Sequence, residues 1–299
     1  MGFLRLVLRS LAHALEAARV WAVAMYAVYG LPVLILASKS PGFDAVMAVY
    51  GLAGGGLIEA WTHLVNDYFD FVHGVDLPGV SGTTVYRKHL LVEGYPRAKL
   101  LRLLVVLAGV VLLMAFVAAA VGRPYAVALA AAGLFLGYAY TGPPFTFKYR
   151  ALGHVNLLAG WWLVNTPALY YMATGSFSAK PLLVSLPGIL LVIAVLMGDN
   201  IRDLEVDRRA GVRTLEVILG KKPSRILFAV YVASAYAAQL ALSLLLGAGM
   251  LLPLLSLPLL PSAVKAVMSD PPPPNTDPLV ARLTLTFCAL ESLALWVYV

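Results

Sequence analysis

The sequence predicts an all-α integral membrane protein, on three observations. Hydrophobic residues make up 61% of the 299 residues and charged residues only 12%, which is a more apolar composition than that of soluble domains. Stretches without Asp, Glu, Lys or Arg, such as residues 103–122 and 151–179, reach the roughly 20 residues that cross a bilayer. Lys and Arg gather on one side of these stretches. A soluble globular fold is excluded, and the single cysteine, Cys288, excludes a disulfide scaffold.

Residues 1–19 are expected to form an amphipathic helix on the membrane surface. Charged and His side chains, from Arg5 to Arg19, recur there at helical spacing among Leu and Ala, as they do in interfacial helices. No small-residue cleavage site follows the next apolar run, so the segment is not interpreted as a signal peptide.

Nine transmembrane helices account for the rest of the chain, which we expect to form one domain over residues 1–299. The spans are expected at residues 20–37, 45–65, 102–121, 125–142, 155–173, 182–198, 226–246, 249–264 and 282–299. The apolar run 226–264 is too long for one crossing, and it is divided at Gly247 and Gly249 because glycine commonly ends helices.

The distribution of basic residues predicts the orientation. With the N-terminus inside, 19 of the 22 Lys and Arg residues fall on the inner side, and only Lys39, Arg123 and Lys180 fall on the outer side. The positive-inside rule therefore places the N-terminus in the cytoplasm and the C-terminus outside. We expect a multi-pass protein of the cell membrane, surrounded by the lipid bilayer. The net charge of +7 is explained by this basic face, so nucleic-acid binding is not expected, and the sequence indicates no protein partner.

Two connections on the inner side are long, residues 66–100 and 199–225, and we expect them to form cytoplasmic loops that cap the bundle. Long loops in a compact bundle usually carry function. Seven of the 15 acidic residues lie in two short windows of these loops: Asp67, Asp70, Asp76, Asp199, Asp203, Glu205 and Asp207.

Within each window, the spacing would place the acidic side chains on one face of a helix. Asn66 and Asp70 are four residues apart, and the aspartates of the second window repeat every four residues. Carboxylates at this spacing destabilise a helix unless a cation neutralises them. Oxygen ligands of this kind suit Mg²⁺, which we therefore expect as the cofactor. The expected metal ligands are Asn66, Asp67, Asp70, Asp76, Asp199, Asp203 and Asp207.

A substrate with phosphate groups is expected as well, because Mg²⁺ held by a few carboxylates commonly shares its shell with substrate phosphates. Lys and Arg residues, whose side chains form strong hydrogen bonds with phosphate, lie after or beside the two windows. The windows also lie four spans apart, each after the second span of a four-span set, which predicts two four-helix halves plus a ninth helix.

These residues resemble a known family. Residues 66–70, Asn-Asp-Tyr-Phe-Asp, and residues 200–207, Asn-Ile-Arg-Asp-Leu-Glu-Val-Asp, are similar to the two aspartate-rich motifs of the UbiA-type intramembrane prenyltransferases. Residues 140–145, Tyr-Thr-Gly-Pro-Pro-Phe, followed by Lys-Tyr-Arg at 148–150, resemble the loop after the fourth helix of that family.

The resemblance implies that the helices surround a central cavity in which Mg²⁺ bridges the diphosphate of an isoprenyl donor, such as geranylgeranyl diphosphate. It implies transfer of the prenyl group to an aromatic or lipid acceptor through an allylic carbocation. The residues implied to carry catalysis are Asp67, Asp70, Asp203 and Asp207. Those implied or expected to bind the diphosphate are Asn66, Arg87, Lys88, Lys148, Arg150, Asn200, Arg202 and Arg213.

The motifs are most similar to those of the menaquinone branch, which prenylates 1,4-dihydroxy-2-naphthoate with loss of its carboxylate. Gly74 occupies the usual last aspartate position of the first motif, and Asp76 follows two residues later. The Arg-Pro-Leu-x-x-Gly signature of the ubiquinone and archaeal-lipid branches is absent, but 4-hydroxybenzoate and geranylgeranylglyceryl phosphate remain alternative acceptors. Outside the family the alternative is a secondary transporter, whose polar residues would lie nearer the midplane of the membrane.

An acceptor or carbocation pocket is expected from polar and aromatic side chains in or beside the spans. The candidates are Arg19, Glu59, His63, Tyr68, Tyr138, Tyr140, His154, Asn156 and Trp161. Glu59, His63 and Asn66 form one polar stripe on the second span, and a carboxylate inside a membrane is costly enough to suggest a function. The alternative is a Glu59–His63 hydrogen bond that only holds helices together. Aromatic faces stabilise cations, although aromatic residues at helical spacing more often serve packing or an interface belt.

Overall fold

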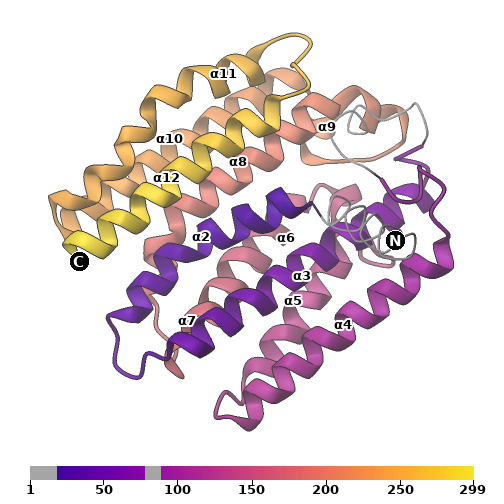
Figure 1. Cartoon of the computed structure of the whole chain (residues 1–299). Helices are drawn as coiled ribbons and strands as arrows, with labels where there is room; N and C mark the ends of the chain where they lie inside the picture. Colours follow the sequence, from indigo (N-terminus) through magenta and orange to yellow (C-terminus); the bar gives the residue numbers. More distant parts are fainter. Residues whose placement is uncertain (1–18, 78–88) are drawn as a thin grey trace, which may run out of the picture.

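The computed structural model describes residues 19–77 and 89–299, which form helices and connecting turns without a strand (Figure 1). Apart from Arg19, the expected amphipathic helix at residues 1–19 lies outside the described residues. The first four helices are α2 (Val20–Ser38), α3 (Ala45–Val72), α4 (Arg97–Ala120) and α5 (Ala126–Thr141). At the start of α3 the Asp44 side chain accepts a hydrogen bond of 3.0 Å from the Met47 backbone N–H, which is a standard N-cap.

The middle of the chain forms one helical run with a change of winding. A short 3₁₀-helix, η2 (Phe147–Arg150), precedes α6 (Gly153–Leu157), the π-helical segment η3 (Leu158–Asn165) and α7 (Thr166–Thr174). Single π-helical turns are rare and concentrate at functional sites. The π-helical segment therefore indicates that a functional site lies near this run.

The remaining elements are α8 (Lys180–Arg209), α9 (Leu215–Leu219), α10 (Lys221–Leu246), the 3₁₀-helix η4 (Ala248–Leu259), α11 (Leu260–Met268) and α12 (Thr276–Tyr298). The predicted break after residue 246 is confirmed, because α10 ends there and Gly247 adopts a φ of 106°. Only glycine takes such a backbone conformation readily.

Seven helical segments of the described chain are long and apolar enough to cross a membrane: α2, α3, α4, α8, α10, η4 with α11, and α12. The apolar α5 is shorter, and the α6–η3–α7 run covers the span expected at residues 155–173. Large apolar side chains are exposed along α4, including Val105, Leu113 and Phe116. An apolar surface of this extent suits contact with lipid.

Apart from Asp76, the acidic residues of the two windows lie on helices and not in the loops expected at residues 66–100 and 199–225. Helix α3 continues to Val72 and α8 continues to Arg209. The stacked carboxylates do not end these helices, because basic side chains neutralise them: Lys148, from the 3₁₀-helix η2, contacts Asp70, and Arg202, on α8 itself, contacts Asp203. The spans thus extend beyond the boundaries at residues 65 and 198 that apolar character alone predicts.

Helix α8 lies at the centre of the bundle, where Ile193, Met197, Phe228 and Phe287 are buried together. Helices α2 to α5 pack against one another, and α8, α10 and α11 with η4 form a second group (Figure 1). Helix α12 joins the groups by packing against both α2 and α8. The α6–η3–α7 run, expected in the second half, also packs against α2, α3 and α5.

Candidate active site

A cavity of about 850 Å³ runs through the bundle. Its lining comes from α2, α3, α4, α5, the α6–η3–α7 run, α8 and α12. Along α3 the lining extends from Tyr50 to Asp70, which corresponds to roughly 30 Å of helix at a rise of 1.5 Å per residue. The cavity therefore follows most of the depth of a hydrocarbon core, which is about 30 Å thick.

The two ends of the cavity differ in chemistry. One end, which we call the aspartate pole, is lined by Arg19, Asn66, Asp70, Asp76, Lys148, Asp199, Asn200, Arg202, Asp203, Asp207 and Asp277. The other end is lined by small and apolar residues: Gly51, Gly54, Met114, Ala118, Ala126 and Met172. The two predicted aspartate windows, far apart in the sequence, thus meet at one end of an otherwise apolar cavity.

Asp70 is the centre of the first window. One of its carboxylate oxygens, Oδ2, accepts hydrogen bonds from Asn66 Nδ2 at 2.9 Å and from Lys148 Nζ at 2.7 Å, and the Tyr149 hydroxyl donates to its Oδ1. Burial opposes the charge of Lys148, but the carboxylates of Asp70 and Asp207 outweigh it and raise the pKa of that ammonium group further. Lys148 is therefore a permanent positive charge at the pole.

Asp76 returns to the first window through a turn that glycine permits. After the end of α3, Gly74 adopts a φ of 76°, and the backbone N–H of Asp76 donates to the Asp70 carbonyl at 3.2 Å. A residue with a side chain is strained at this φ. This turn places the Asp76 side chain on the cavity wall, two residues beyond the usual position in the family motif.

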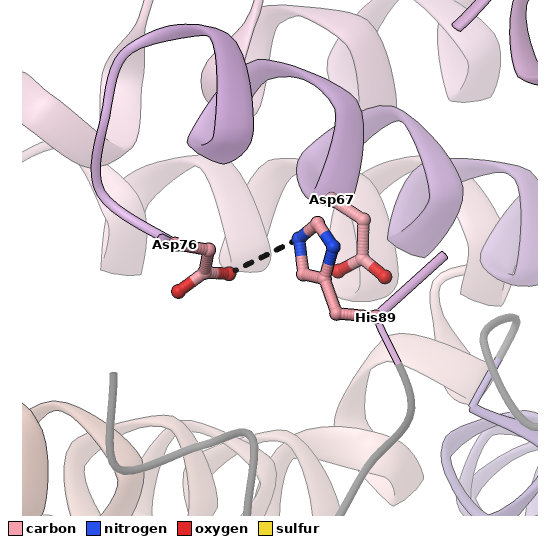
Figure 2. A group of neighbouring side chains, drawn as sticks. All are labelled: Asp67, Asp76 and His89. Atoms are coloured by element: carbon pink, nitrogen blue, oxygen red, sulfur yellow. Dashed lines mark ion pairs between the residues drawn. The ribbon is translucent and has the colours of Figure 1, made fainter. Parts of the chain in front are cut away.

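Asp67 and Asp76 form a buried group with His89, which precedes α4 (Figure 2). Their nearest ligand atoms all lie within 4.8 Å of one another, and His89 Nε2 lies 3.5 Å from Asp76 Oδ2. Burial opposes the imidazolium, but contact with Asp76 and the nearby carboxylates outweighs burial and raises the pKa of His89. Burial likewise opposes the carboxylate of Asp76, yet the contact with His89 and the charge of Lys148 lower its pKa. The sequence interpretation did not include His89 in the site.

Asp67 is not part of the cavity lining, although its neighbours Asn66 and Asp70 are. It is 1% exposed, and its Oδ1 accepts a hydrogen bond of 3.3 Å from Arg19 Nη2, which also contacts Asn66 Oδ1 at 3.4 Å. Arg19, expected in the acceptor pocket, therefore lies against the first motif.

The second window is organised by Arg202. Its guanidinium donates to Asp203 through Nε at 2.9 Å and through Nη2 at 2.8 Å, and it also contacts Asp199 and Asp277. Asp277 lies at the start of α12 and was not among the residues that the sequence suggested. Its approach depends on the packing of α12 against α8, which sequence spacing does not indicate.

Asp207 lines the same pole from the last turn of α8. Its side chain is buried, and no ion pair within 4.0 Å engages it in the described part of the chain. Six residues that define the pole carry carboxylates and three carry positive charges. An oxygen-only donor set with excess negative charge suits a divalent cation of the Mg²⁺ type, so the residues present fit this cofactor.

A second buried network supports Asn200. Its Nδ2 donates to Glu216 Oε2 at 2.9 Å, and the other oxygen of Glu216 lies 2.8 Å from His154 Nε2. Glu216 is fully buried on α9. His154, expected in the acceptor pocket, thus lies outside the cavity lining and links the α6 segment to α9.

Other expected residues divide between the cavity and the surface. Glu59, His63, Tyr140, Asn156 and Trp161 line the cavity. Tyr68 and Tyr138 do not line it, since both pack against Phe69 in a separate cluster. Arg150 and Arg213 are exposed and lie outside the lining, so the structure does not bring them to the pole. Arg87 and Lys88 lie outside the described residues.

Comparison with known proteins identifies relatives of this chain. A 1,4-dihydroxy-2-naphthoate octaprenyltransferase of Bacillus subtilis is 29% identical over 184 residues, which are 60% of this chain and 57% of the relative. The UbiA prenyltransferase domain-containing protein 1 of Gallus gallus is 31% identical over 216 residues, covering 72% of this chain and 61% of the relative. The matched regions thus span less than two thirds of these relatives.

The fold also matches solved structures. A UbiA homologue from Archaeoglobus fulgidus, bound to DMAPP and Mg²⁺, superposes with a TM-score of 0.65 at 16% identity, covering 95% of this chain and 99% of that one. The UbiA prenyltransferase family matches residues 10–276, which include both aspartate motifs and the whole aspartate pole except Asp277. The chain therefore belongs to the UbiA prenyltransferase family.

Proposed function

We propose that this protein is a Mg²⁺-dependent prenyltransferase that transfers a polyprenyl group from an isoprenyl diphosphate to 1,4-dihydroxy-2-naphthoate, as in menaquinone biosynthesis. The observation that carries the proposal is the meeting of both aspartate motifs with Lys148 at one end of an apolar cavity. A polar pole suits a diphosphate, and the long apolar remainder suits a prenyl chain. The similarity to the Bacillus subtilis dihydroxynaphthoate octaprenyltransferase supports this choice of acceptor.

The pole residues are proposed to hold the donor. Asp70, Asp203 and Asp207, with Asp76, Asp199 and Asn66, provide the oxygen ligands for Mg²⁺. When bound, Mg²⁺ neutralises the charge that develops on the departing diphosphate. Lys148 stands beside Asp70 and provides a fixed positive charge for a diphosphate oxygen. Preorganised charges of this kind stabilise the transition state because they need no rearrangement as the bond breaks.

The cavity is proposed to protect the reaction from water. When the C–O bond to the diphosphate breaks, the allylic carbon becomes electrophilic, and water would convert it to an alcohol. The apolar lining excludes water from the chain, and Trp161 and Tyr140 present aromatic rings to the cavity. Aromatic faces attract a cation. The ring of the acceptor then forms the new C–C bond.

We also propose that the aspartate pole faces the cytoplasm and that the N-terminus lies on the same side in the cell membrane. This orientation rests on the position of 19 of the 22 basic residues on that side, as the positive-inside rule requires. A cytoplasmic pole would receive a water-soluble aromatic acid and the diphosphate group of the donor directly.

Product analysis by mass spectrometry tests the proposal. The purified protein in detergent is incubated with Mg²⁺, geranylgeranyl diphosphate and, in separate reactions, dihydroxynaphthoate, hydroxybenzoate and geranylgeranylglyceryl phosphate. We expect a prenylated product of dihydroxynaphthoate that has lost CO₂. The product is expected to be absent with EDTA and in the Asp203→Ala variant.

Other outcomes point elsewhere. Product on hydroxybenzoate or geranylgeranylglyceryl phosphate alone would retain the metal site and replace the acceptor. A diphosphate that stays intact with every acceptor and with donors of other lengths would overturn the transferase proposal, and a transport assay in vesicles would follow.

A further inference from the structure

A second group of polar side chains lines the cavity away from the aspartate pole. These side chains have no role in the proposed binding of the metal and the diphosphate. The members of this group, which we call the polar belt, are Tyr26, Glu59, His63 and Asn165, and all four line the cavity. They come from α2, α3 and the π-helical segment η3. Apolar residues such as Ile58, Met25 and Val192 line the cavity around them. A polar group in an apolar wall is expensive to maintain and suggests a function.

Two members of the polar belt form a pair on α3. His63 Nε2 lies 2.9 Å from Glu59 Oε1, and their side chains are 16% and 13% exposed. His63 Nε2 meets Glu59 as an ion pair but is buried without a hydrogen-bond partner among the described residues, so the pair keeps a polar atom for a ligand in the cavity. A carboxylate beside an imidazole orients the ring and increases its ability to accept a proton.

The other two members come from α2 and η3. The Tyr26 hydroxyl donates to Asn165 Oδ1 at 2.6 Å, which leaves Asn165 Nδ2 buried without a partner among the described residues. The position of Tyr26 depends on Gly55, because a Cβ there would lie 1.7 Å from the Tyr26 hydroxyl. A buried amide N–H₂ without a partner is uncommon in proteins. It offers a donor to an oxygen atom of a molecule in the cavity.

The depth of the polar belt matches the place where an acceptor must lie. Glu59, His63, Asn66 and Asp70 follow one another on one face of α3 and all line the cavity. His63 and Glu59 lie roughly 4.5 and 10 Å deeper than Asn66 along the helix. A diphosphate at the aspartate pole directs its reactive carbon toward this level, and an attacking carbon must come within about 3.5 Å of it.

We propose that the polar belt binds the hydroxyl-bearing ring of the acceptor and that the Glu59–His63 pair accepts the proton of that hydroxyl. The inference rests on the proposed function and adds the acceptor site to it. As the ring carbon bonds to the allylic carbon, the C–O bond breaks and its electron pair leaves with the diphosphate. The hydroxyl proton passes to His63, and the ring becomes a neutral dienone. When that ring carbon loses its carboxylate as CO₂, the electron pair returns to the ring and the oxygen recovers the proton from His63.

Two variants that remove the titratable groups test this role, Glu59→Gln and His63→Gln. The matched control is Thr284→Val, a buried hydroxyl of α12 outside the cavity lining that donates to the Val280 carbonyl at 3.0 Å. Donor binding is measured by calorimetry with Mg²⁺ and geranylgeranyl thiolodiphosphate, which does not react. Transfer is measured with dihydroxynaphthoate and with ring-fluorinated dihydroxynaphthoates, whose hydroxyl groups are more acidic.

We expect both variants to bind the donor analogue like the wild type and to lose about 10²–10⁴-fold in kcat for transfer, the range of general-base catalysis. The loss is expected to shrink as the acceptor becomes more acidic, because an acidic hydroxyl needs less help from a base. The Thr284→Val variant is expected to keep wild-type kcat.

Three results would overturn the role of the polar belt. The first is a kcat for transfer within threefold of the wild type in both variants. The second is a loss of kcat that is the same with every acceptor, and the third is a loss of donor-analogue binding as large as the loss of kcat. A wild-type protein that neither binds the analogue nor transfers the prenyl group would instead overturn the proposed function itself. The two failures are therefore distinguishable.

Discussion

Lys148 Nζ lies 2.7 Å from Asp70 Oδ2, although 78 residues separate them in the sequence. The contact joins the 3₁₀-helix after α5 to the last turns of α3. It neutralises the first aspartate motif from outside its own helix. Asp203 is neutralised in a different way, by Arg202 of its own helix.

Replacement of Lys148 by Met is expected to lower kcat/KM for the donor by about 10²–10³-fold, because a preorganised charge at the leaving group is lost. In the metal-free protein the change leaves the Asp70 carboxylate buried without its cation, which costs about 3–5 kcal/mol of unfolding free energy. Steady-state kinetics and thermal unfolding in detergent measure the two effects. The control is Arg150→Ala, two residues away and exposed, which should retain activity. Equal losses in both variants would contradict the assigned position of Lys148.

Asp70→Ala and Asp203→Ala are each expected to abolish Mg²⁺-dependent turnover while the protein still folds. Each variant removes an oxygen ligand from one of the two motifs that meet at the aspartate pole. Product formation is measured by mass spectrometry, and folding is checked by size-exclusion chromatography and thermal unfolding. Substantial turnover in both variants would contradict the metal site.

Asp277→Ala tests the residue that α12 contributes to the pole. Without this carboxylate, Arg202 keeps its ion pairs with Asp199 and Asp203 but loses its ion pair with α12. A hydrogen bond between charged groups contributes about 1.5–3 kcal/mol, so kcat/KM for the donor should fall roughly 10- to 100-fold. Asp270→Ala is the control, since Asp270 pairs with Lys221 on the surface. If kcat/KM for the donor is unchanged in Asp277→Ala, α12 only encloses the site and its carboxylate does not contribute to donor binding or turnover.

The pair of Asp76 and His89 predicts a pH effect on the metal-free protein. Contact with Asp76 raises the pKa of His89 above its ordinary 6.5. The contribution of the imidazolium to the free energy of unfolding is therefore fully present below pH 6.5, and it disappears as the pH rises through the raised pKa. The pKa of Asp76 is lowered, so the contribution of its carboxylate to the free energy of unfolding is fully present above pH 3.8 and is lost only as the pH falls through the lowered pKa. His89→Gln should therefore lower the unfolding temperature more at about pH 5.5 than at about pH 8.5. A difference of the opposite sign would contradict the pairing.

Glu291 predicts an unusual gain in stability. Both of its carboxylate oxygens are buried in α12 without a hydrogen-bond partner among the described residues. An unsatisfied buried polar group costs about 1–3 kcal/mol, so Glu291→Leu is expected to raise the unfolding temperature in detergent. Unchanged transfer activity would separate this effect from the active site. A lower unfolding temperature would indicate that Glu291 has a stabilising partner.

Much of the fold follows from local properties of the sequence. Apolar runs predict the positions of the helices, and Gly247 predicts the break between α10 and η4, because hydrophobicity and backbone freedom belong to short segments. The four-residue spacing of Asp199, Asp203 and Asp207 predicts that they share one face of a helix. The helix ends were harder to predict, since α3 and α8 continue beyond the apolar runs. Their last turns are stabilised by contacts with side chains such as Lys148, which lies on another element.

The sequence by itself determined the membrane-protein class, the two aspartate motifs and the family resemblance, because each depends on residue type and on spacing along one segment. Only the tertiary structure decided which partners complete the site. Asp277 reaches Arg202 through the packing of α12 against α8, and His89, before α4, reaches Asp76, after α3. It also separated Lys148, inside the cavity, from the equally basic Arg150, which is exposed. Charge and spacing do not distinguish such neighbours, because the direction of a side chain depends on the packing of the whole bundle.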